Sequence, residues 1–299
     1  MEPQMETIER LMRDAREKGA EERRPAVAKL GELAKEGSLK RQAIEALMKL
    51  LDYRLISGDA FAPCAGTVLE MCGQAIERAV PFQQEVIRVE WLVEFDYEPI
   101  SMEARRLLDV LGHLSGEEVL GTLRDALTLA DPYLRCAAVV SLLLRGQTVG
   151  EGDVEAVAAC RLTRVTLWEK LRELGMESLM PLRWRANDVL AASDLTRWLA
   201  HSSELGEPPE EIELMKRFRI RDDDGQLDDA FLFRFRTFPK PWEPGEGWMA
   251  GMAGPYRDGV ALDSPWSCFK HWDSMSPDEH FHMEYYRGEE PEGPGGKTR

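Results

Sequence analysis

Residues 101–146 read SMEARRLLDVLGHLSG (101–116), EEVLGTLRDALTLA (117–130) and DPYLRCAAVVSLLLRG (131–146), and this stretch decides the fold of the chain. Apolar residues recur every three to four positions within each part, and only short turns separate the parts, which predicts three consecutive helices. A shift of 31 positions lays the first part on the third. Self-similarity at this period is typical of helical hairpins that stack into a solenoid and bury their apolar faces against their neighbours. The matched pairs are Leu107 with Ala138, Leu108 with Val139, Leu111 with Leu142 and Ser115 with Gly146.

Two helix starts in this stretch carry specific chemical signals. Ser115 is followed three residues later by Glu118, which predicts a capping box in which both side chains satisfy backbone N–H groups. Asp131 before Pro132 predicts an N-cap followed by a first-turn proline, whose missing N–H costs nothing at that position. We therefore expect the second and third helices to begin near residues 115 and 131.

The same periodicity runs through the first 200 residues. Gly19, Gly37 and Pro81 follow apolar stripes and predict the ends of helices. We expect about eleven helices in this part of the chain, joined by short turns. The stripes outside 101–146 lie within Met5–Met12, Ala26–Ala34, Ala43–Leu51, Phe61–Ala79, Phe82–Phe95, Asp153–Cys160, Thr163–Leu174 and Arg185–Ala200.

Two of the hairpins share a pattern of small and apolar positions. One unit contains Ala104, Leu108, Leu111 and Gly112, and the other contains Asp131, Pro132, Arg135, Ala137, Ala138 and Leu142. This pattern resembles HEAT repeats, in particular the short bacterial type also found in phycobilin-lyase-like proteins. The resemblance covers residues 20–200 and implies an α-solenoid that binds other proteins. Some members of this group are suggested to handle tetrapyrroles, and one branch binds damaged DNA through a basic groove, which this acidic chain lacks.

Beyond residue 201 the pattern changes. HSSELGEPPEE (201–211) is polar and is typical of a linker, and the apolar period then shortens towards 2. The runs at 212–220 and 230–238 flank an acidic loop and predict a β-hairpin, in which Phe231, Phe233 and Phe235 alternate with polar or aliphatic residues. We therefore expect a mostly α protein: a HEAT-like α-solenoid at 1–202, a small Trp/Gly/Pro-rich α+β domain at 203–288, and a disordered tail at 289–299.

The net charge of the chain limits the classes of binding partner that are expected. The chain has 38 Lys and Arg against 54 Asp and Glu, a net charge of −16, and residues 51–100 alone have a net charge of −6. Such a field repels phosphate backbones, so a nucleic acid is not an expected ligand. It attracts a basic protein and speeds the encounter. Solubility is the plainer interpretation of the same charge.

Neither a membrane nor a secretory route is expected. The first residues, MEPQMETIER, include acids and lack the apolar core of a signal peptide. No run approaches the roughly 20 apolar residues that a membrane span needs. The five cysteines form no CxxC pair, which favours reduced core thiols in a cytoplasmic protein. The oligomeric state is not indicated by the sequence.

Two groups of residues are candidates for binding. The partner-binding candidates are the acidic side chains of the −6 stretch: Glu85, Glu90, Glu94, Asp96 and Glu98. The second group is aromatic and could line a pocket for a sugar, a peptide or a cation, although large side chains also fill the core of a small domain. It consists of Trp242, Trp248, Trp266 and Trp272.

The sequence offers little for catalysis, metal binding or a cofactor. It contains no GxSxG, no HExxH and no glycine loop with lysine for phosphate. Asp222–Gly225 fails the calcium-loop pattern because Phe231 stands where a glutamate is needed. His280 and His282 could chelate from a strand, but Ser276-Pro277 with Glu279 predicts a helix start, and residues two apart then diverge by about 200°.

The resulting expectation is a non-catalytic protein-binding module that holds a basic partner protein with an acidic solenoid surface. One concrete form is an immunity or inhibitor protein that masks a cationic bacterial toxin. The alternative is a small catalytic or ligand-binding C-terminal domain presented by the HEAT scaffold. That alternative requires a shared pocket for acidic and histidine side chains among Asp263, His271, Asp273 and His280.

Overall fold

The structure is a computed structural model of the chain. Contacts divide the chain into two compact units, Met1–Val154 and Glu155–Arg299, and each unit is considered by itself. The residues that the structure describes are 2–86, 97–202, 206, 208–221, 225–237, 247–272 and 275–285. In five parts of these ranges the structure describes the backbone but not the side chains: 2–6, 80–86, 97–100, 266–271 and 283–285.

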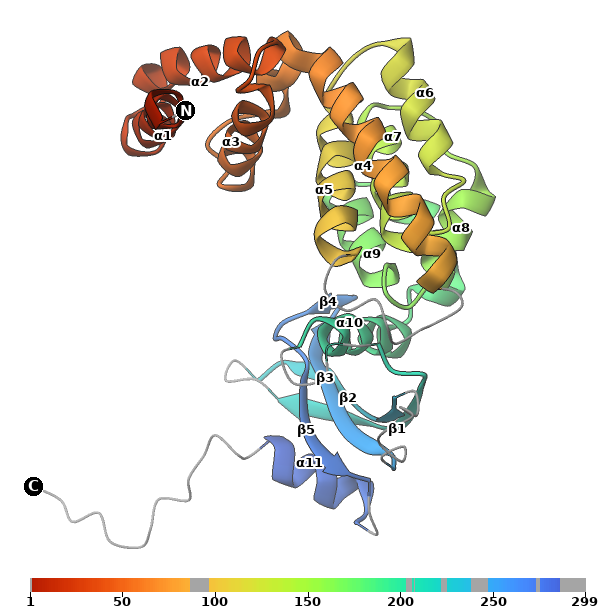
Figure 1. Cartoon of the computed structure of the whole chain (residues 1–299). Helices are drawn as coiled ribbons and strands as arrows, with labels where there is room; N and C mark the ends of the chain where they lie inside the picture. The colour runs from red at the N-terminus through yellow and green to blue at the C-terminus, as the bar shows by residue number, and fades with distance from the viewer. Residues whose placement is uncertain are drawn as a thin grey trace, which may run out of the picture. The chain divides into compact units, whose positions relative to one another are not determined.

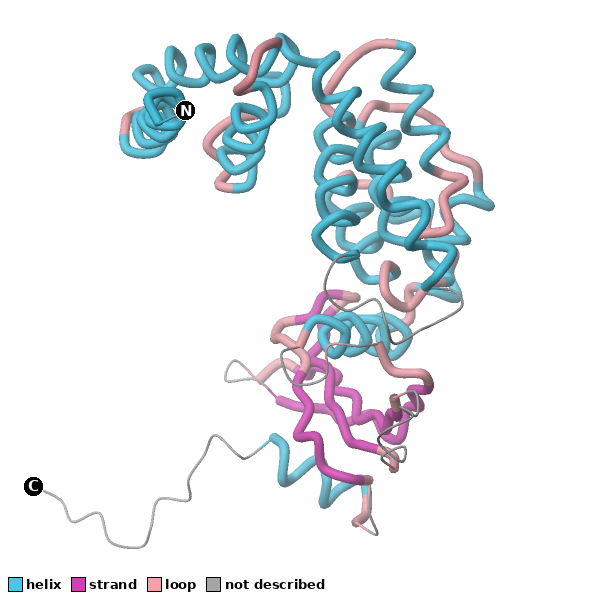
Figure 2. Tube along the Cα trace, in the orientation of Figure 1, coloured by secondary structure: helices cyan, strands magenta, loops and turns pink. Residues whose placement is uncertain are grey.

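The first unit is helical (Figures 1 and 2). Consecutive helices pack against one another, and α5 also packs against α7. The three helices expected in 101–146 are therefore confirmed. The helices of this unit are α1 (Glu2–Glu17), α2 (Ala20–Lys35), α3 (Lys40–Asp52), α4 (Ala65–Val86), α5 (Tyr97–Leu111), α6 (Glu117–Ala126) and α7 (Pro132–Leu144); a 3-10 helix spans Gly58–Cys64, and α8 (Glu151–Ala159) crosses the division.

Several of the residues paired by the 31-residue shift are buried where α5 packs against α7. Leu108, Leu111 and Leu142 are buried in the same core cluster. The Ser141 hydroxyl donates a hydrogen bond to the carbonyl oxygen of Leu108 at 2.9 Å. Gly112 permits this close approach, because a Cβ at that position would lie 2.9 Å from the Ser141 oxygen. The shared pattern therefore reflects two helices that bury matching faces against each other.

One of the two expected helix caps is confirmed and the other is wrong. Asp131 caps α7, since its Oδ1 accepts hydrogen bonds from the backbone N–H groups of Tyr133 at 2.7 Å and Leu134 at 3.0 Å. The capping box expected at Ser115 does not form, because α6 begins at Glu117 with Gly116 as its N-cap. Gly116 has φ 127°, a conformation that glycine adopts at little cost, and it moves the start of the helix by one residue.

The second unit contains two helices, a sheet and a final helix. The helices are α9 (Arg164–Glu173) and α10 (Asn187–His201), with 3-10 turns at Glu177–Leu179 and Leu182–Trp184 between them. The sheet has five strands in which β1 pairs with β2, β2 with β3, and β3 with both β4 and β5, all antiparallel. The bounds are β1 (Glu211–Arg221), β2 (Leu227–Arg236), β3 (Met249–Arg257), β4 (Val260–Ala261), β5 (Trp266–His271) and α11 (Pro277–Tyr285).

Alternation along β2 gives the sheet two apolar faces. Phe231, Phe233 and Phe235 are buried, and α10 approaches this face so closely that a Cβ on Gly251 would lie 3.0 Å from the side chain of Leu195. The opposite face carries Ala230, Leu232 and Met252, packed against side chains that include Phe218 of β1 and Phe281 of α11. The expected hairpin is confirmed, as is the combination of a mostly helical chain with a small sheet.

The compact units divide at residue 154, whereas the sequence predicted a boundary after residue 202. Hydrogen bonds explain the difference, since α9 and α10 are attached to the sheet. The indole Nε1 of Trp168 donates to the carbonyl oxygen of Gly259 at 2.8 Å. The Tyr256 hydroxyl donates to Asp194 at 2.9 Å. The polar stretch 201–211 therefore joins parts of one compact unit.

The helix start predicted at Ser276 is confirmed by a reciprocal capping box. The Ser276 backbone N–H and hydroxyl both donate to Oε2 of Glu279 at 2.7 Å, and the Glu279 N–H donates back to the Ser276 oxygen at 3.3 Å. The helical geometry separates the two histidines, since His280 is buried and His282 is exposed. The arrangement does not favour chelation of a metal by this pair.

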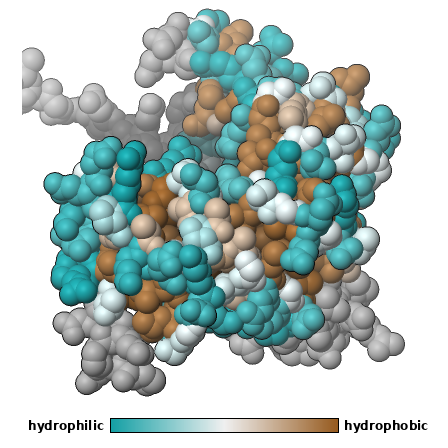
Figure 3. All heavy atoms as spheres, turned by 90° about the horizontal axis from the view of Figure 1, so that it is seen from above, coloured by the Kyte–Doolittle hydropathy of each residue, from teal (hydrophilic) through white to brown (hydrophobic). Residues whose placement is uncertain are grey.

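The surface mixes polar and apolar residues. On the face shown in Figure 3, hydrophobic residues are interspersed with hydrophilic ones. Large hydrophobic side chains that are exposed in the first unit come from different places: Tyr53 follows α3, Met102 is in α5 and Leu144 is in α7. Within the described part of the chain, no helix combines the length and the apolar character required to span a bilayer.

Candidate functional site

The candidate site is an open cavity of about 860 Å³ in the second unit. One wall is a single face of α10, where polar and aromatic residues stand at spacings of three and four, so that they lie above one another. Glu169 of α9 and the loop that follows β4 complete the lining. The residues from α10 are Asp194, Arg197, Trp198 and His201, with Ser202 just beyond. The others are Ala261 at the end of β4 and, from the loop, Leu262, Asp263, Ser264 and Pro265.

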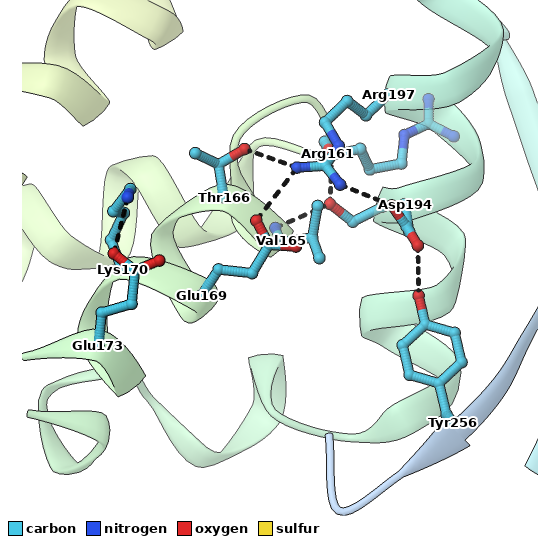
Figure 4. A network of polar contacts seen from close by, with 10 residues as sticks. Arg161, Val165, Thr166, Glu169, Lys170, Glu173, Asp194, Arg197 and Tyr256 are labelled. Atoms are coloured by element: carbon cyan, nitrogen blue, oxygen red, sulfur yellow. Dashed lines mark hydrogen bonds and ion pairs between the residues drawn. The ribbon is translucent and has the colours of Figure 1, made fainter. Parts of the chain in front are cut away.

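Arg197 is the centre of a polar network on this wall (Figure 4). Its Nη2 donates to Oδ1 of Asp194 at 2.9 Å, and its Nη1 donates to Oε2 of Glu169 at 3.2 Å and to the hydroxyl oxygen of Thr166 at 3.3 Å. The guanidinium therefore bridges carboxylates from two helices. Burial acts to lower the pKa of Arg197, but the negative charges of Glu169 and Asp194 outweigh burial and raise that pKa above its ordinary value.

Asp194 is the buried anchor of this network. It is 4 % exposed, yet both of its carboxylate oxygens are satisfied. Oδ1 accepts from Arg197, and Oδ2 accepts from the Tyr256 hydroxyl at 2.9 Å. Burial, followed by the negative charge of Asp194, raises the pKa of Tyr256 above its ordinary value, so the phenol remains a donor. A buried carboxylate is stable only with such partners.

The outer part of the cavity offers carboxylate oxygens that remain open. Oδ1 of Asp263 accepts the backbone N–H of Ser264 at 2.7 Å. Among the described residues, no hydrogen bond reaches Oδ2 of Asp263 or Oε1 of Glu169. Among the described residues of the lining there are three carboxylates and one guanidinium, and the guanidinium is already paired twice. The lining has an excess of two negative charges and favours a positively charged ligand.

A second groove, of about 800 Å³, lies along α1 and α3 in the first unit. Its lining combines apolar side chains such as Ile8 and Met12 with three acidic and three basic residues, so its charge is balanced. It therefore offers no electrostatic preference for an ion of either sign. The charged residues are Glu9, Glu17 and Glu45, and Arg13, Arg16 and Lys49.

The structure does not describe the side chains of the acidic residues that the sequence suggested for partner binding. Glu90, Glu94 and Asp96 lie outside the described residues. Glu85 belongs to α4 and Glu98 to α5, but their side chains are not described.

The four tryptophans have different surroundings where they are described. Trp248 lies under two guanidinium groups, with the Arg234 carbon 4.4 Å and the Arg236 carbon 5.3 Å from its ring centroid. Trp272 stacks on His280 of α11 with ring centroids 4.4 Å apart. The side chain of Trp266 in β5 is not described, and Trp242 lies outside the described residues. Neither Trp248 nor Trp272 lines the 860 Å³ cavity, and the tryptophan among its described lining residues is Trp198.

The pocket required by a catalytic C-terminal domain is not assembled from the described side chains. Asp263 lines the cavity, but His280 is buried beside Trp272 and is not part of the lining. The side chain of His271 is not described, and Asp273 lies outside the described residues. Among the described residues there is also no group of three His, Cys, Asp or Glu side chains that could hold a metal ion.

Sequence reasoning missed the α10 wall, although one signal for it was present. Asp194, Arg197, Trp198 and His201 stand at i, i+3, i+4 and i+7, which indicates a polar face on a helix that is otherwise apolar. The carboxylate of Asp263 and the hydroxyl of Tyr256 reach this wall from distant positions, and no local pattern connects them. Protein-family models, curated proteins and solved structures gave no match to this chain.

Proposed function

We propose that this chain is a non-catalytic, cytoplasmic protein-binding module that holds a basic partner protein. Its helical hairpins would form a HEAT-like α-solenoid, and its second unit would supply an acidic binding cavity. The concrete form is an immunity or inhibitor protein that masks a cationic bacterial toxin. In the first unit, the acidic residues Glu85 and Glu98 are further candidates for contact with a basic partner.

One observation carries this proposal: the cavity on α10 has three carboxylates and one internally paired guanidinium. Open carboxylate oxygens in a partly enclosed site bind cations more strongly than the same groups on a flat surface, because fewer water molecules compete and screen. Asp194 and Tyr256 hold the wall in place, so little conformational freedom has to be lost on binding.

The charge of the whole chain supports the same class of partner. A net charge of −16 raises the rate of encounter with a basic protein and lowers it with an acidic one. The residues beyond 200 alone contain 21 acidic against 12 basic side chains. Because exposed charges are screened by salt, this long-range attraction should weaken steeply as ionic strength rises.

A salt titration with a matched pair of proteins tests the proposal. The immobilised full chain is exposed to a basic protein and, in parallel, to its lysine-acetylated form, at NaCl concentrations from 0.02 to 0.5 M. We expect the basic form to bind more tightly than the acetylated form, with affinity that falls as salt rises. Equal binding of both forms, or binding that is indifferent to salt, would remove the electrostatic basis of the proposal.

A second candidate function is a small-molecule site in the C-terminal unit. The cavity volume of about 860 Å³ favours it, since ligand sites commonly measure about 300–1,000 Å³. The ligand would be an organic cation, and the helical unit would act as a scaffold. A thermal-shift assay with spermidine and with L-arginine tests this candidate, because a ligand that binds only the folded state raises the melting temperature. No shift at millimolar concentration excludes it for these two probes.

A further inference from the structure

We propose that the cavity on α10 receives an arginine side chain of the basic partner, with its guanidinium between Glu169 and Asp263 and against the ring of Trp198. This inference rests on the proposed function and names the group that the partner supplies. The three residues all line the same cavity but come from α9, from the loop after β4 and from α10.

The open acceptors of the cavity define the sign of the ligand. Both oxygens of Asp194 are already bound, and Arg197 is held by Asp194 and Glu169. Oε1 of Glu169 and Oδ2 of Asp263 are the carboxylate oxygens of the lining that take no hydrogen bond from the described residues. Both side chains are exposed, so these oxygens are accessible to a ligand, and a positively charged donor satisfies hydrogen bonding and charge together.

The geometry favours a guanidinium over an ammonium group. Arg197 already demonstrates this mode of binding, since its two terminal nitrogens reach carboxylates on two different elements. A planar guanidinium carries five N–H donors in a fixed fork, whereas an ammonium group is a compact point charge. Trp198 adds a second preference, because guanidinium groups stack on indole rings while they donate at their edges.

The dimensions favour a side chain of a protein over a free ion. The cavity is open to solvent, and its volume of about 860 Å³ leaves room for residues on both sides of the inserted arginine. Leu262 lines the cavity and is 48 % exposed. It offers an apolar contact to the methylene stem of an arginine or to a neighbouring apolar residue of the partner. A free arginine can make the first of these contacts but not the second.

Peptide binding to the full chain tests the inference. The probes are a synthetic dodecapeptide with four arginines in a Gly/Ser background, the same peptide with four lysines, and free L-arginine. Binding is measured by isothermal titration calorimetry at 0.05 M NaCl. We expect the arginine peptide to bind several-fold more tightly than the lysine peptide and far more tightly than L-arginine.

Variants of the cavity locate the site. E169Q with D263N should weaken the arginine peptide about tenfold, which corresponds to two exposed ion pairs. The matched control is E173Q, because Glu173 lies on the same helix but pairs with Lys170 and does not line the cavity. W198L should reduce the preference for arginine over lysine. W198F is a milder change that should reduce the same preference in part, and it replaces W198L in the test if W198L is poorly folded.

The outcomes separate this inference from the proposed function. If both peptides bind equally and E169Q/D263N binds like E173Q, the inference is overturned while binding of a basic partner elsewhere on the chain stands. If neither peptide binds, both fail. If free L-arginine binds as tightly as the peptide, the cavity takes a small cation and the assignment to a partner side chain is overturned.

Discussion

The hydroxyl group of Tyr256 on β3 donates a hydrogen bond to Oδ2 of Asp194 on α10 at 2.9 Å. Both side chains are almost completely buried. The contact joins the middle of the sheet to the helix whose next turn carries Arg197 and Trp198. It fixes the position of the cavity wall relative to the strand that leads to β4 and Asp263.

Removal of this hydroxyl should destabilise the second unit. Tyr256→Phe leaves Oδ2 of Asp194 buried without its donor, which costs about 1–3 kcal/mol for a buried acceptor. Urea unfolding measures the difference. Tyr53→Phe is the control, since Tyr53 is 55 % exposed. Removal of its hydroxyl should change the unfolding free energy by less than about 0.5 kcal/mol. Equal stabilities of the two variants would show that the Asp194 contact contributes nothing.

Close packing at Gly259 gives a second prediction. Gly259 has φ +77°, and a Cβ there would lie 3.1 Å from the indole ring of Trp168. Gly259→Ala should therefore lower the unfolding free energy by more than backbone strain alone would lower it, because the added methyl group also collides with the indole ring. Gly225→Ala is the matched control, because φ is +81° there and the nearest atom is 3.9 Å away. Melting temperatures measured side by side should rank Gly225→Ala above Gly259→Ala, and the reverse order would contradict the packing.

The cap of α7 gives a third prediction. Asp131→Ala removes the acceptor for the N–H groups of Tyr133 and Leu134 and should cost about 1–2 kcal/mol. Asp131→Asn should retain most of the stability, because asparagine caps equally well. Ser115→Ala should have little effect, since Ser115 does not cap α6. Urea unfolding followed by circular dichroism distinguishes the three variants, and a loss in Ser115→Ala equal to that in Asp131→Ala would contradict the assignment.

Two buried thiols should make the helical unit sensitive to alkali. Burial raises the pKa of Cys72 to about 12 and that of Cys64 to about 11, from an ordinary value of 9.0. Above pH 9 the unfolded chain releases these protons while the folded chain keeps them, so stability falls as pH rises towards 12.

The slope of that dependence is the measurement. In Cys72→Ala, the fall in unfolding free energy between pH 9 and 11 should be shallower by up to about 1.4 kcal/mol per pH unit, the value for one proton. Any loss of packing in the variant shifts the whole curve and leaves its slope unchanged. Parallel curves for the wild type and Cys72→Ala would contradict the burial of this thiol as a titrating group.

The helices could be predicted because their signals are local. The stripe that includes Leu108 and Leu111 repeats every three to four residues, and Asp131-Pro132 marks a start whose chemistry is complete within four residues. The hairpin was predictable for the same reason, since Phe231, Phe233 and Phe235 alternate along one strand. The error at Ser115 arose because Gly116 takes the N-cap position instead, with a positive φ that glycine adopts at little cost.

The site could be predicted only in part because its contacts are not local. Asp194 and Tyr256 are 62 residues apart, and no motif links them. The spacing of Asp194, Arg197 and Trp198 indicated a polar helix face, but only the folded sheet brings Asp263 to the same cavity. Tryptophan content pointed to Trp248 and Trp272, which pack against arginine and histidine side chains elsewhere in the unit.

The most direct test of the central claim is zero-length cross-linking of the full chain to a lysine-rich peptide. A water-soluble carbodiimide joins a carboxylate to an amine without a spacer, so the two groups must come into direct contact, and mass spectrometry identifies the linked residue. The cavity predicts amide bonds to Glu169 or Asp263 that disappear at 0.5 M NaCl. Cross-links confined to other carboxylates, with Glu169 and Asp263 unmodified by the peptide, would contradict the assignment of the cavity as the site that holds a basic partner.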